Sequence, residues 1–298
     1  MIESHLGEIA ALGTAICWTV TSISFELAGR KIGSLSVNLI RLIMAFFLIG
    51  TFTLFTRGMF LPLDASSDVW IWLSISGLIG FVLGDLFLFQ AFVEVGARIS
   101  MLIMASSPPI TALLGFIIMG EVLTSQQLIG MLITISGIAT VILVKKSGNK
   151  KLEFSHPVKG LTYAFLGAFG QSLGLILSKK GMGNYNAFAA TQIRIISATI
   201  GFLIVITILN KWPNIKTAVK DSDAMAKVSI GAFFGPFLGV SLSLIAVKFT
   251  TTGVASTLMG IVPVLIIAPS IIIFKEKIGS KEIIGAIVTV AGVSLLFL

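Results

Sequence analysis

Charge is scarce in this chain of 298 residues. Only 11% of the residues are Asp, Glu, Lys or Arg, whereas about 25% is usual in soluble domains. Apolar residues make up 56% of the chain. This balance excludes a soluble globular protein. The apolar residues fall into runs that reach the roughly 20 residues needed to cross a hydrocarbon core of about 30 Å, and these runs leave no room for a separate soluble domain.

Cysteine and histidine are almost absent. The single cysteine, Cys17, lies inside the first apolar run and excludes an internal disulfide. The two histidines, His5 and His156, lie in the N-terminal tail and in a polar linker. We find no glycine-rich phosphate loop and no cluster with metal-ligand spacing. The sequence therefore predicts neither an enzyme nor a metal site, requires no cofactor, and offers no nucleotide-binding domain for an ATP-driven pump.

The first eight residues contain no Lys or Arg, so they lack the basic region of a cleaved signal peptide. The net charge of +8 comes from basic residues in short loops. Lipid headgroups and the orientation rule explain them better than nucleic acid does. We predict a multi-pass protein of the cell membrane, monomeric or homodimeric, that contacts lipid and binds no nucleic acid.

The segment from Ser106 to Gly137 comes back 155 residues later. Nine of its residues recur in one gapless register: Pro108, Ile117, Ile118, Glu121, Ser125, Ile129, Gly130, Thr134 and Gly137 match Pro263, Ile272, Ile273, Glu276, Ser280, Ile284, Gly285, Thr289 and Gly292. The first two helices match at an offset of 153, where Arg41 returns as Arg194. The chain is a tandem duplication.

The apolar runs predict an all-α membrane protein with ten transmembrane helices. They lie at roughly 8–28, 35–56, 69–93, 99–119, 126–145, 158–178, 187–209, 227–247, 253–274 and 281–298. We divide the chain into a first five-helix repeat (1–146), a polar linker (147–157) and a second repeat (158–298). Because five is odd, the second copy enters the membrane from the opposite side, which makes an inverted repeat as in many secondary transporters.

Loop charges predict the orientation. The loops on one side of the predicted topology hold fifteen Lys and Arg residues, and those on the other hold four. The positive-inside rule then places the first set in the cytoplasm and both termini outside.

The paired "P…GE…G" pattern, Trp18, and the segment GDLFLFQAFVEVGARISMLIMASSPP that leads to Glu121 resemble the EamA-type branch of the drug/metabolite transporter superfamily. The resemblance covers nearly the whole chain. It implies a ten-helix secondary carrier with a central cavity, often one that exports amino acids or other small metabolites. It also implies cytoplasmic termini, against the charge count, so the orientation stays open.

Asp85 is the deepest acidic residue, in the third helix, and a buried charge in a membrane is a candidate for function. Phe81, Phe89 and Phe92 share its helical face. Asp85 is predicted either to contact substrate or a coupling proton, or to pair with an arginine as a structural link. Arg41 and Arg194 are predicted either to bind a carboxylate or phosphate, or to reach the interface or pair with an acid.

Trp18, Ser22 and Glu26 share one face of the first helix, and Gln171 is the repeat equivalent of Trp18. This face suits a cavity for a small zwitterion, although Trp and Glu near a helix end also suit anchoring at the interface. Gln90 is a weaker candidate of the same kind.

Other repeated residues point to structural roles. Glu121 and Glu276 lie at polar turns, where the dipole of the next helix stabilises a carboxylate. We therefore predict a structural role for both and prefer it to a role in gating. Pro108 and Pro263 predict kinks or hinges in the fourth and ninth helices. The motifs Gly80-x-x-x-Gly84 and Gly170-x-x-x-Gly174 predict close helix packing.

Together these features predict a secondary transporter that exports a small organic metabolite, such as an amino acid, by alternating access. Protons are the candidate coupling ion. The alternatives are an exchanger or importer of a carboxylated or phosphorylated metabolite, which needs both arginines in the cavity, and a membrane scaffold or lipid-active enzyme. A channel is disfavoured because no ring of identical polar residues recurs.

Overall fold

A computed structural model of the chain describes residues 5–119, 122–145, 152–250, 255 and 258–295. Its first half contains α1 (Leu6–Ile32), α2 (Ser34–Arg57), α3 (Ser67–Gly77), the π-helix η2 (Leu78–Gly84), α4 (Asp85–Met104), α5 (Ser107–Met119) and α6 (Ser125–Ile142). A two-stranded antiparallel hairpin follows, formed by β1 (Leu143–Lys145) and β2 (Leu152–Phe154). Its pairing sets Leu143 opposite Phe154. The hairpin lies around the predicted linker, where the sequence predicted only a polar connection.

The second half contains α7 (Val158–Met182), α8 (Ala187–Ile208), α9 (Trp212–Ala218), α10 (Ser222–Ala232), the π-helix η3 (Phe233–Gly239), α11 (Val240–Phe249), α13 (Val262–Leu265), α14 (Ile267–Phe274) and α15 (Ser280–Leu295). Several helices begin at side chains that accept backbone N–H groups. Thr124 and Gln127 form a reciprocal capping box at the start of α6. Asn186 and Asp221 cap α8 and α10.

Seven helical stretches among the described residues are long and apolar enough to cross a membrane. They are Leu6–Ile32, Ser34–Arg57, Ser67–Met104, Ser125–Ile142, Val158–Met182, Ala187–Ile208 and Ser222–Phe249. The third of them contains Gly96, whose backbone is not helical (φ 81°, ψ 161°). The predicted third and fourth helices therefore separate at Gly96, between the predicted ends at 93 and 99.

Full-length spans were not found at three of the ten predicted positions. The predicted fourth helix is interrupted at residues 105–106, before α5, and the ninth at residues 260–261 and again at 266. The described part of the tenth, α15, has 16 residues. Apart from the short hairpin, the described residues thus form a helical, multi-pass architecture with seven candidate spans and shorter apolar helices.

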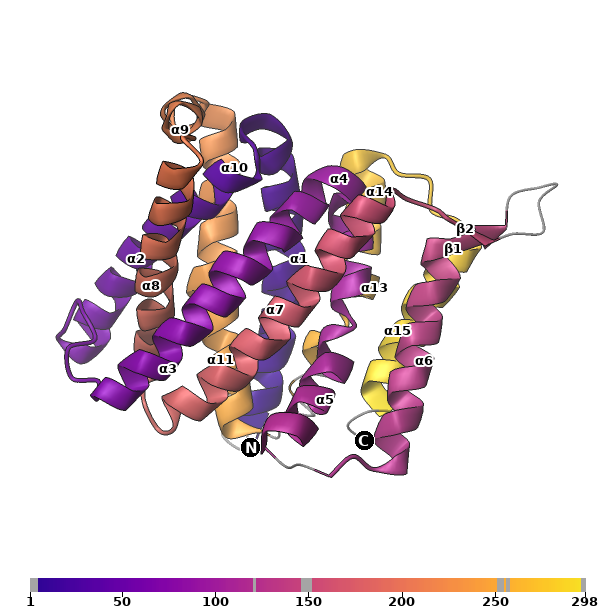
Figure 1. The fold of residues 1–298 in the computed structure, drawn as a ribbon, viewed down its shortest axis with the longest axis horizontal. Helices are drawn as coiled ribbons and strands as arrows, with labels where there is room; N and C mark the ends of the chain where they lie inside the picture. Colours follow the sequence, from indigo (N-terminus) through magenta and orange to yellow (C-terminus); the bar gives the residue numbers. More distant parts are fainter. Residues whose placement is uncertain (1–4, 120–121, 146–151, 251–254, 256–257, 296–298) are drawn as a thin grey trace.

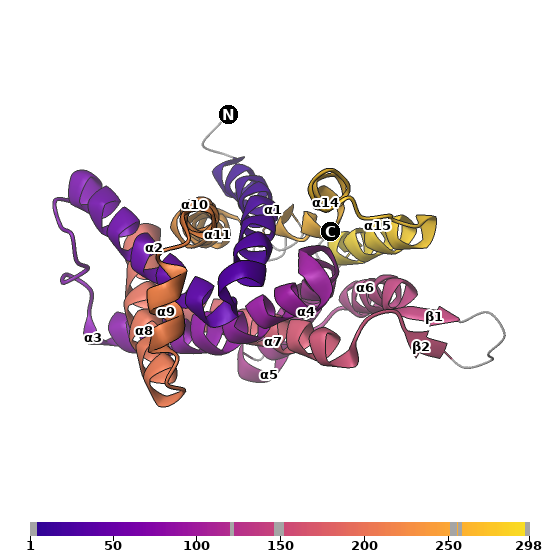
Figure 2. The same ribbon diagram turned by 90° about the horizontal axis from the view of Figure 1, so that it is seen from above.

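The two halves exchange their first helices. Seen from above, α1 lies in one row with α10, α11, α14 and α15, whereas α7 lies in the other row with α3, α4 and α6 (Figure 2). Accordingly α1 packs against α10, η3 and α11, and its repeat mate α7 packs against α3, η2 and α4. The remaining contacts are also reciprocal, since α2 packs against α8 and α6 against α15 (Figure 1).

Glycines make these contacts close, as predicted. A Cβ atom added to Gly174 would lie 2.8 Å from the Cα atom of Gly80, and one added to Gly170 would lie 2.7 Å from that of Gly84. The two small-residue motifs pack against each other, so the predicted close packing at these glycines joins η2 to α7.

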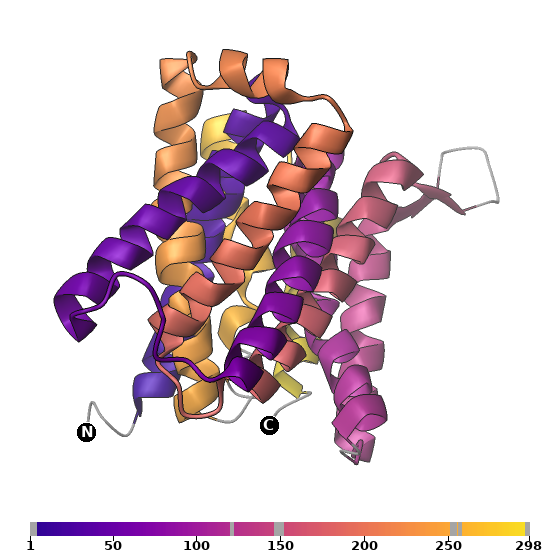
Figure 3. The same cartoon turned by 60° about the vertical axis from the view of Figure 1, so that its left-hand side comes forward.

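One end of the bundle carries α9, the hairpin and the turn between α14 and α15; it is the upper end in Figure 1 and Figure 3. This end also carries the loops in which the sequence places most of the basic residues. Which side of the membrane it faces stays a prediction.

Candidate functional site

A cavity of about 160 Å³ lies between the two rows of helices. Its lining is symmetric between the halves, because many lining residues occur as repeat-equivalent pairs. Ten such pairs line it: Trp18 and Gln171, Ser22 and Leu175, Arg41 and Arg194, Phe81 and Pro236, Asp85 and Val240, Leu88 and Ser243, Met104 and Met259, Ala105 and Gly260, Ser107 and Val262, Pro108 and Pro263. The cavity is therefore lined by equivalent parts of the two repeats.

Two π-helical segments shape its walls. η2 and η3 each span seven residues and lie at positions 155 apart, so they are equivalent in the repeat. π-Helical segments are rare in proteins overall, and those that occur often lie at functional sites. η2 contributes Phe81 and leads into Asp85, and η3 contributes Pro236 and leads into Val240. The same backbone irregularity thus presents a carboxylate from one half and an apolar side chain from the other.

Interrupted helices form a further part of the wall. The breaks at residues 105–106 and 260–261 are also 155 apart, and Ala105 and Gly260 line the cavity. Pro108 and Pro263, predicted as kink residues, follow the breaks and line it too. Non-helical backbone at membrane depth occurs where it lines a cavity or is buried in protein, and discontinuous helices form substrate sites in many transporters.

A buried ion pair stands in the wall. Asp85 and Arg41 are both about 3% exposed, and an Arg41 Nη2 group donates to Asp85 Oδ2. Gln171 Nε2 donates to the other carboxylate oxygen, Oδ1. Asn38 Oδ1 accepts from Arg41 Nε at 3.2 Å and from Nη2 at 3.0 Å. The Arg41 guanidinium also lies 4.5 Å from the centre of the Phe89 ring. Both carboxylate oxygens of Asp85 thus accept a hydrogen bond, and Arg41 donates from Nε and Nη2.

Arg194 is equally buried, at 4% exposure, but its surroundings differ. Its guanidinium lies 4.4 Å from the centre of the Phe81 ring. No hydrogen bond or ion pair of this guanidinium to any described residue is found, and its buried Nε lacks a partner. Asp85 is near enough to interact electrostatically with Arg194, but among the described residues only Arg41 has hydrogen-bond partners for its guanidinium.

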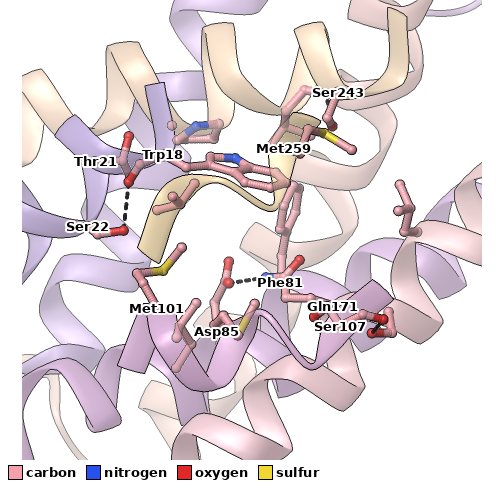
Figure 4. A pocket seen from close by; sticks show the side chains of 18 of the residues that line it. Trp18, Thr21, Ser22, Phe81, Asp85, Met101, Ser107, Gln171, Ser243 and Met259 are labelled. Atoms are coloured by element: carbon pink, nitrogen blue, oxygen red, sulfur yellow. Dashed lines mark hydrogen bonds between the residues drawn. The ribbon is translucent and has the colours of Figure 1, made fainter. Parts of the chain in front are cut away.

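The predicted aromatic side of the site is present. Trp18 and Ser22 both line the cavity, and the Ser22 hydroxyl donates to the Trp18 carbonyl oxygen at 2.7 Å. In Figure 4, Trp18 and Met259 lie on one side of the cavity, and Asp85 and Met101 lie on the other. The indole and the ion pair therefore face the same space.

Two predicted cavity candidates, Glu26 and Gln90, lie outside this lining. Glu26, 1% exposed, accepts the Ala97 N–H at Oε2 (2.6 Å), and its Oε1 lies 2.5 Å from Arg30 Nη2. Glu26 is thus held at the start of the helical segment that follows Gly96, where the helix dipole stabilises a carboxylate. Gln90 accepts from Ser34 and donates to Glu94.

Glu276 lies in the turn before α15, as predicted, and pairs with Arg98 at 2.5 Å. Arg98 also pairs with Glu282 at 2.8 Å, so it joins the fourth helix of one half to the end of the other. Its repeat mate Glu121 lies outside the described residues.

Several polar lining residues were not predicted: Thr21, Ser107, Thr111, Ser172 and Ser243. Hydroxyl groups in apolar helices commonly bond to their own backbone, as Ser172 and Ser243 also do, so composition does not mark them. Ser107 and Ser243 are the repeat equivalents of Val262 and Leu88, so at these two positions one half has a hydroxyl group where the other half has an apolar side chain. Asn38 also escaped prediction, although it lies one helical turn before Arg41. In the described part of the chain, no group of three His, Cys, Asp or Glu residues is placed to hold a metal ion.

The fold and the cavity define a multi-pass helical membrane protein with a solute-sized cavity between two duplicated halves. A model of the EamA-like transporter family matches residues 5–143 and 158–298. The chain belongs to the EamA-like transporter family and is a membrane transporter of the cell membrane. It is 24% identical over 304 residues to a protein of Archaeoglobus fulgidus described as an uncharacterized transporter, with 97% of each chain covered.

The fold also resembles that of a protein solved by crystallography, with a TM-score of 0.68 and 15% sequence identity. The similarity covers 97% of this chain and 95% of the other. At this identity the likeness concerns the fold alone.

Proposed function

We propose that the protein is a secondary transporter that moves a small organic metabolite by alternating access to the central cavity. The observation that carries this proposal is the lining of one cavity by ten repeat-equivalent pairs. A site on the axis between two inverted halves is reached from either side when the halves rock against each other.

The proposed architecture has ten crossings in two inverted repeats, residues 1–146 and 158–298, joined by the linker 147–157. In this scheme α5, the α13–α14 segment and α15 are the crossings that fall short of a full-length helix. The start of α1 and the end of α15 lie at the same end of the bundle, the lower end in Figure 1. This supports an even number of crossings.

The cavity volume supports a small substrate. An apolar protein cavity of about 150 Å³ holds one benzene molecule, and the cavity here measures about 160 Å³. A metabolite the size of an amino acid is therefore proposed. The direction is proposed to be outward, which the sequence resemblance favours.

Exchange or import of an anionic metabolite is the second candidate. It requires Arg41 and Arg194 inside the cavity, and both line it. Efflux from loaded proteoliposomes with and without an external counter-substrate separates the two: net export proceeds without a counter-substrate, whereas exchange requires one.

Alternating access is tested by labelling a cysteine in the cavity. In a Cys17→Ser background, Ser22→Cys places a thiol in the lining. We expect a membrane-impermeant thiol reagent to reach it from either side, in proportions that shift when substrate is added to one side. Thr207→Cys, at an exposed position near the end of α8, is the control and reacts from one side only. Reaction of the cavity thiol from a single side under all conditions contradicts alternating access, and unchanged labelling from both sides indicates a channel.

A further inference from the structure

The two arginines of the cavity occupy equivalent positions but differ in their partners. Arg41 donates its hydrogen bonds to Asp85 and Asn38. The equivalent positions around Arg194 hold Val240 in place of Asp85 and Thr191 in place of Asn38. Thr191 directs its hydroxyl to the Ala187 carbonyl oxygen of its own helix. The second half thus kept the arginine and lacks both groups that satisfy it in the first half.

A buried guanidinium without a hydrogen-bond acceptor is costly in a membrane protein, even with the Asp85 charge nearby. Charged groups at membrane depth are normally paired or face a cavity, and an unpaired charge retains its full desolvation penalty. The Phe81 ring covers one face of Arg194, but a cation–π contact leaves the N–H donors unused. Arg194 lines the cavity. An acceptor that enters the cavity, water or a solute, satisfies these donors, and only an anionic one also compensates the charge.

The charge of the cavity selects the kind of acceptor. Arg41 and Arg194 contribute two positive charges, and Asp85 contributes one negative charge. One monovalent anion neutralises the site, whereas a phosphate dianion leaves an excess negative charge. A planar carboxylate also matches the fork of a guanidinium with two parallel hydrogen bonds.

We propose that Arg194 binds the carboxylate of the transported solute, so that the substrates are small monocarboxylates. This inference rests on the proposed function and names its substrate class. When substrate is bound, its carboxylate accepts hydrogen bonds from Arg194, just as the Asp85 carboxylate accepts one from Arg41. The mostly apolar remainder of the lining, including Trp18 and Met259, then receives the rest of the solute.

Binding is measured on the full chain in detergent by titration calorimetry, with carboxylates and their neutral amides as matched probes. The probes are lactate and lactamide, 4-methylpentanoate and its amide, phenylacetate and its amide, and inorganic phosphate. We expect at least one carboxylate to bind and its amide to bind far more weakly. Arg194→Gln should weaken carboxylate binding by about 10- to 100-fold, the range expected for hydrogen bonds to a charged group.

A second pair of variants leaves Arg194 in place. Val240→Asp supplies the carboxylate that the first half has at the equivalent position, so we expect it to occupy Arg194 and to abolish carboxylate binding. Val240→Asn has nearly the same size without the charge and should keep most of the binding. These variants keep the inference testable if Arg194→Gln does not fold.

Three results overturn the inference. They are binding of phosphate but of no carboxylate, failure of every carboxylate to bind the wild-type protein, and an unchanged carboxylate-to-amide ratio in both Arg194→Gln and Val240→Asp. Transport in proteoliposomes separates this inference from the proposed function. If the amides cross the membrane as fast as the carboxylates, the protein is a transporter but Arg194 does not select a carboxylate. Carboxylates that bind through Arg194 without crossing support the site and contradict transport.

Discussion

The unequal environments of the two buried arginines predict unequal costs of removing them. Arg41→Gln leaves the Asp85 carboxylate, 3% exposed, with Gln171 as its remaining described hydrogen-bond donor. Breaking a buried pair by removing one partner costs about 3–5 kcal/mol. Arg194→Gln leaves no bonded carboxylate behind and loses mainly the contact with Phe81, worth about 0.5–2 kcal/mol. We therefore expect Arg41→Gln to lower the free energy of unfolding by at least about 1 kcal/mol more.

A double-mutant cycle isolates the pair. Asp85→Asn combined with Arg41→Gln removes both charges, so the double variant should lose less stability than the sum of the single variants, by about 1–3 kcal/mol. The free energy of unfolding is measured in mixed micelles by titration with a denaturing detergent. Purified wild-type protein and Arg194→Gln serve as references.

The reasoning fails if Arg194→Gln destabilises the protein as much as Arg41→Gln does, or if the effects at Arg41 and Asp85 simply add. Additive effects mean that the pair contributes no coupling energy, and equal losses mean that pairing does not distinguish the two arginines. The contrast is informative because the two arginines have the same repeat position and nearly the same exposure, 3% and 4%.

Three further predictions follow from single contacts. Gly96→Ala should lower the free energy of unfolding by about 1–3 kcal/mol, because the φ of 81° and ψ of 161° at Gly96 suit only glycine; a thermal unfolding midpoint equal to that of wild type contradicts this. Gly137→Ala should cost about 1–3 kcal/mol by overpacking, because the new Cβ would lie 2.5 Å from the backbone N of Thr289; Thr140→Ala, on an exposed position of the same helix, is the control in the same unfolding assay. Asp85→Asn should abolish the response of transport to an imposed pH step while exchange persists, if Asp85 carries the coupling proton; coupling that persists in proteoliposomes removes Asp85 from that role.

The predicted site residues were partly brought together. Trp18, Gln171, Asp85 and the two arginines came from helices one, two, three, six and seven, and all line one cavity. Their grouping was predictable because ionisable and large polar side chains are expensive in lipid and turn to the protein interior. Glu26 satisfied the same rule differently, since it is buried against a helix start instead of the cavity. Helical spacing places a residue on a face but does not say what that face meets.

The serines and threonines of the lining, and the two π-helical segments, were beyond the reach of sequence reasoning. A hydroxyl in an apolar helix bonds to its own backbone wherever it points, so its type carries little information. The π-helical segments depend on how η2 packs on α7 and η3 on α1, contacts made between residues about 90 to 220 positions apart.

The sequence by itself determined that this is a membrane protein, that it is duplicated, and that it belongs among EamA-like transporters. Composition and repeat register suffice for this, because the bilayer imposes length and apolarity on every crossing segment. Only the tertiary structure decided that the breaks at 105–106 and 260–261 meet at one cavity, that Arg41 is paired there, and that Arg194 is not. The reason is that the packing of distant helices sets the partner of each side chain. In this fold the halves exchange their first helices, which brings Gln171 to Asp85. Val240 stands where a second carboxylate would be, so the same packing gives Arg194 no equivalent partner.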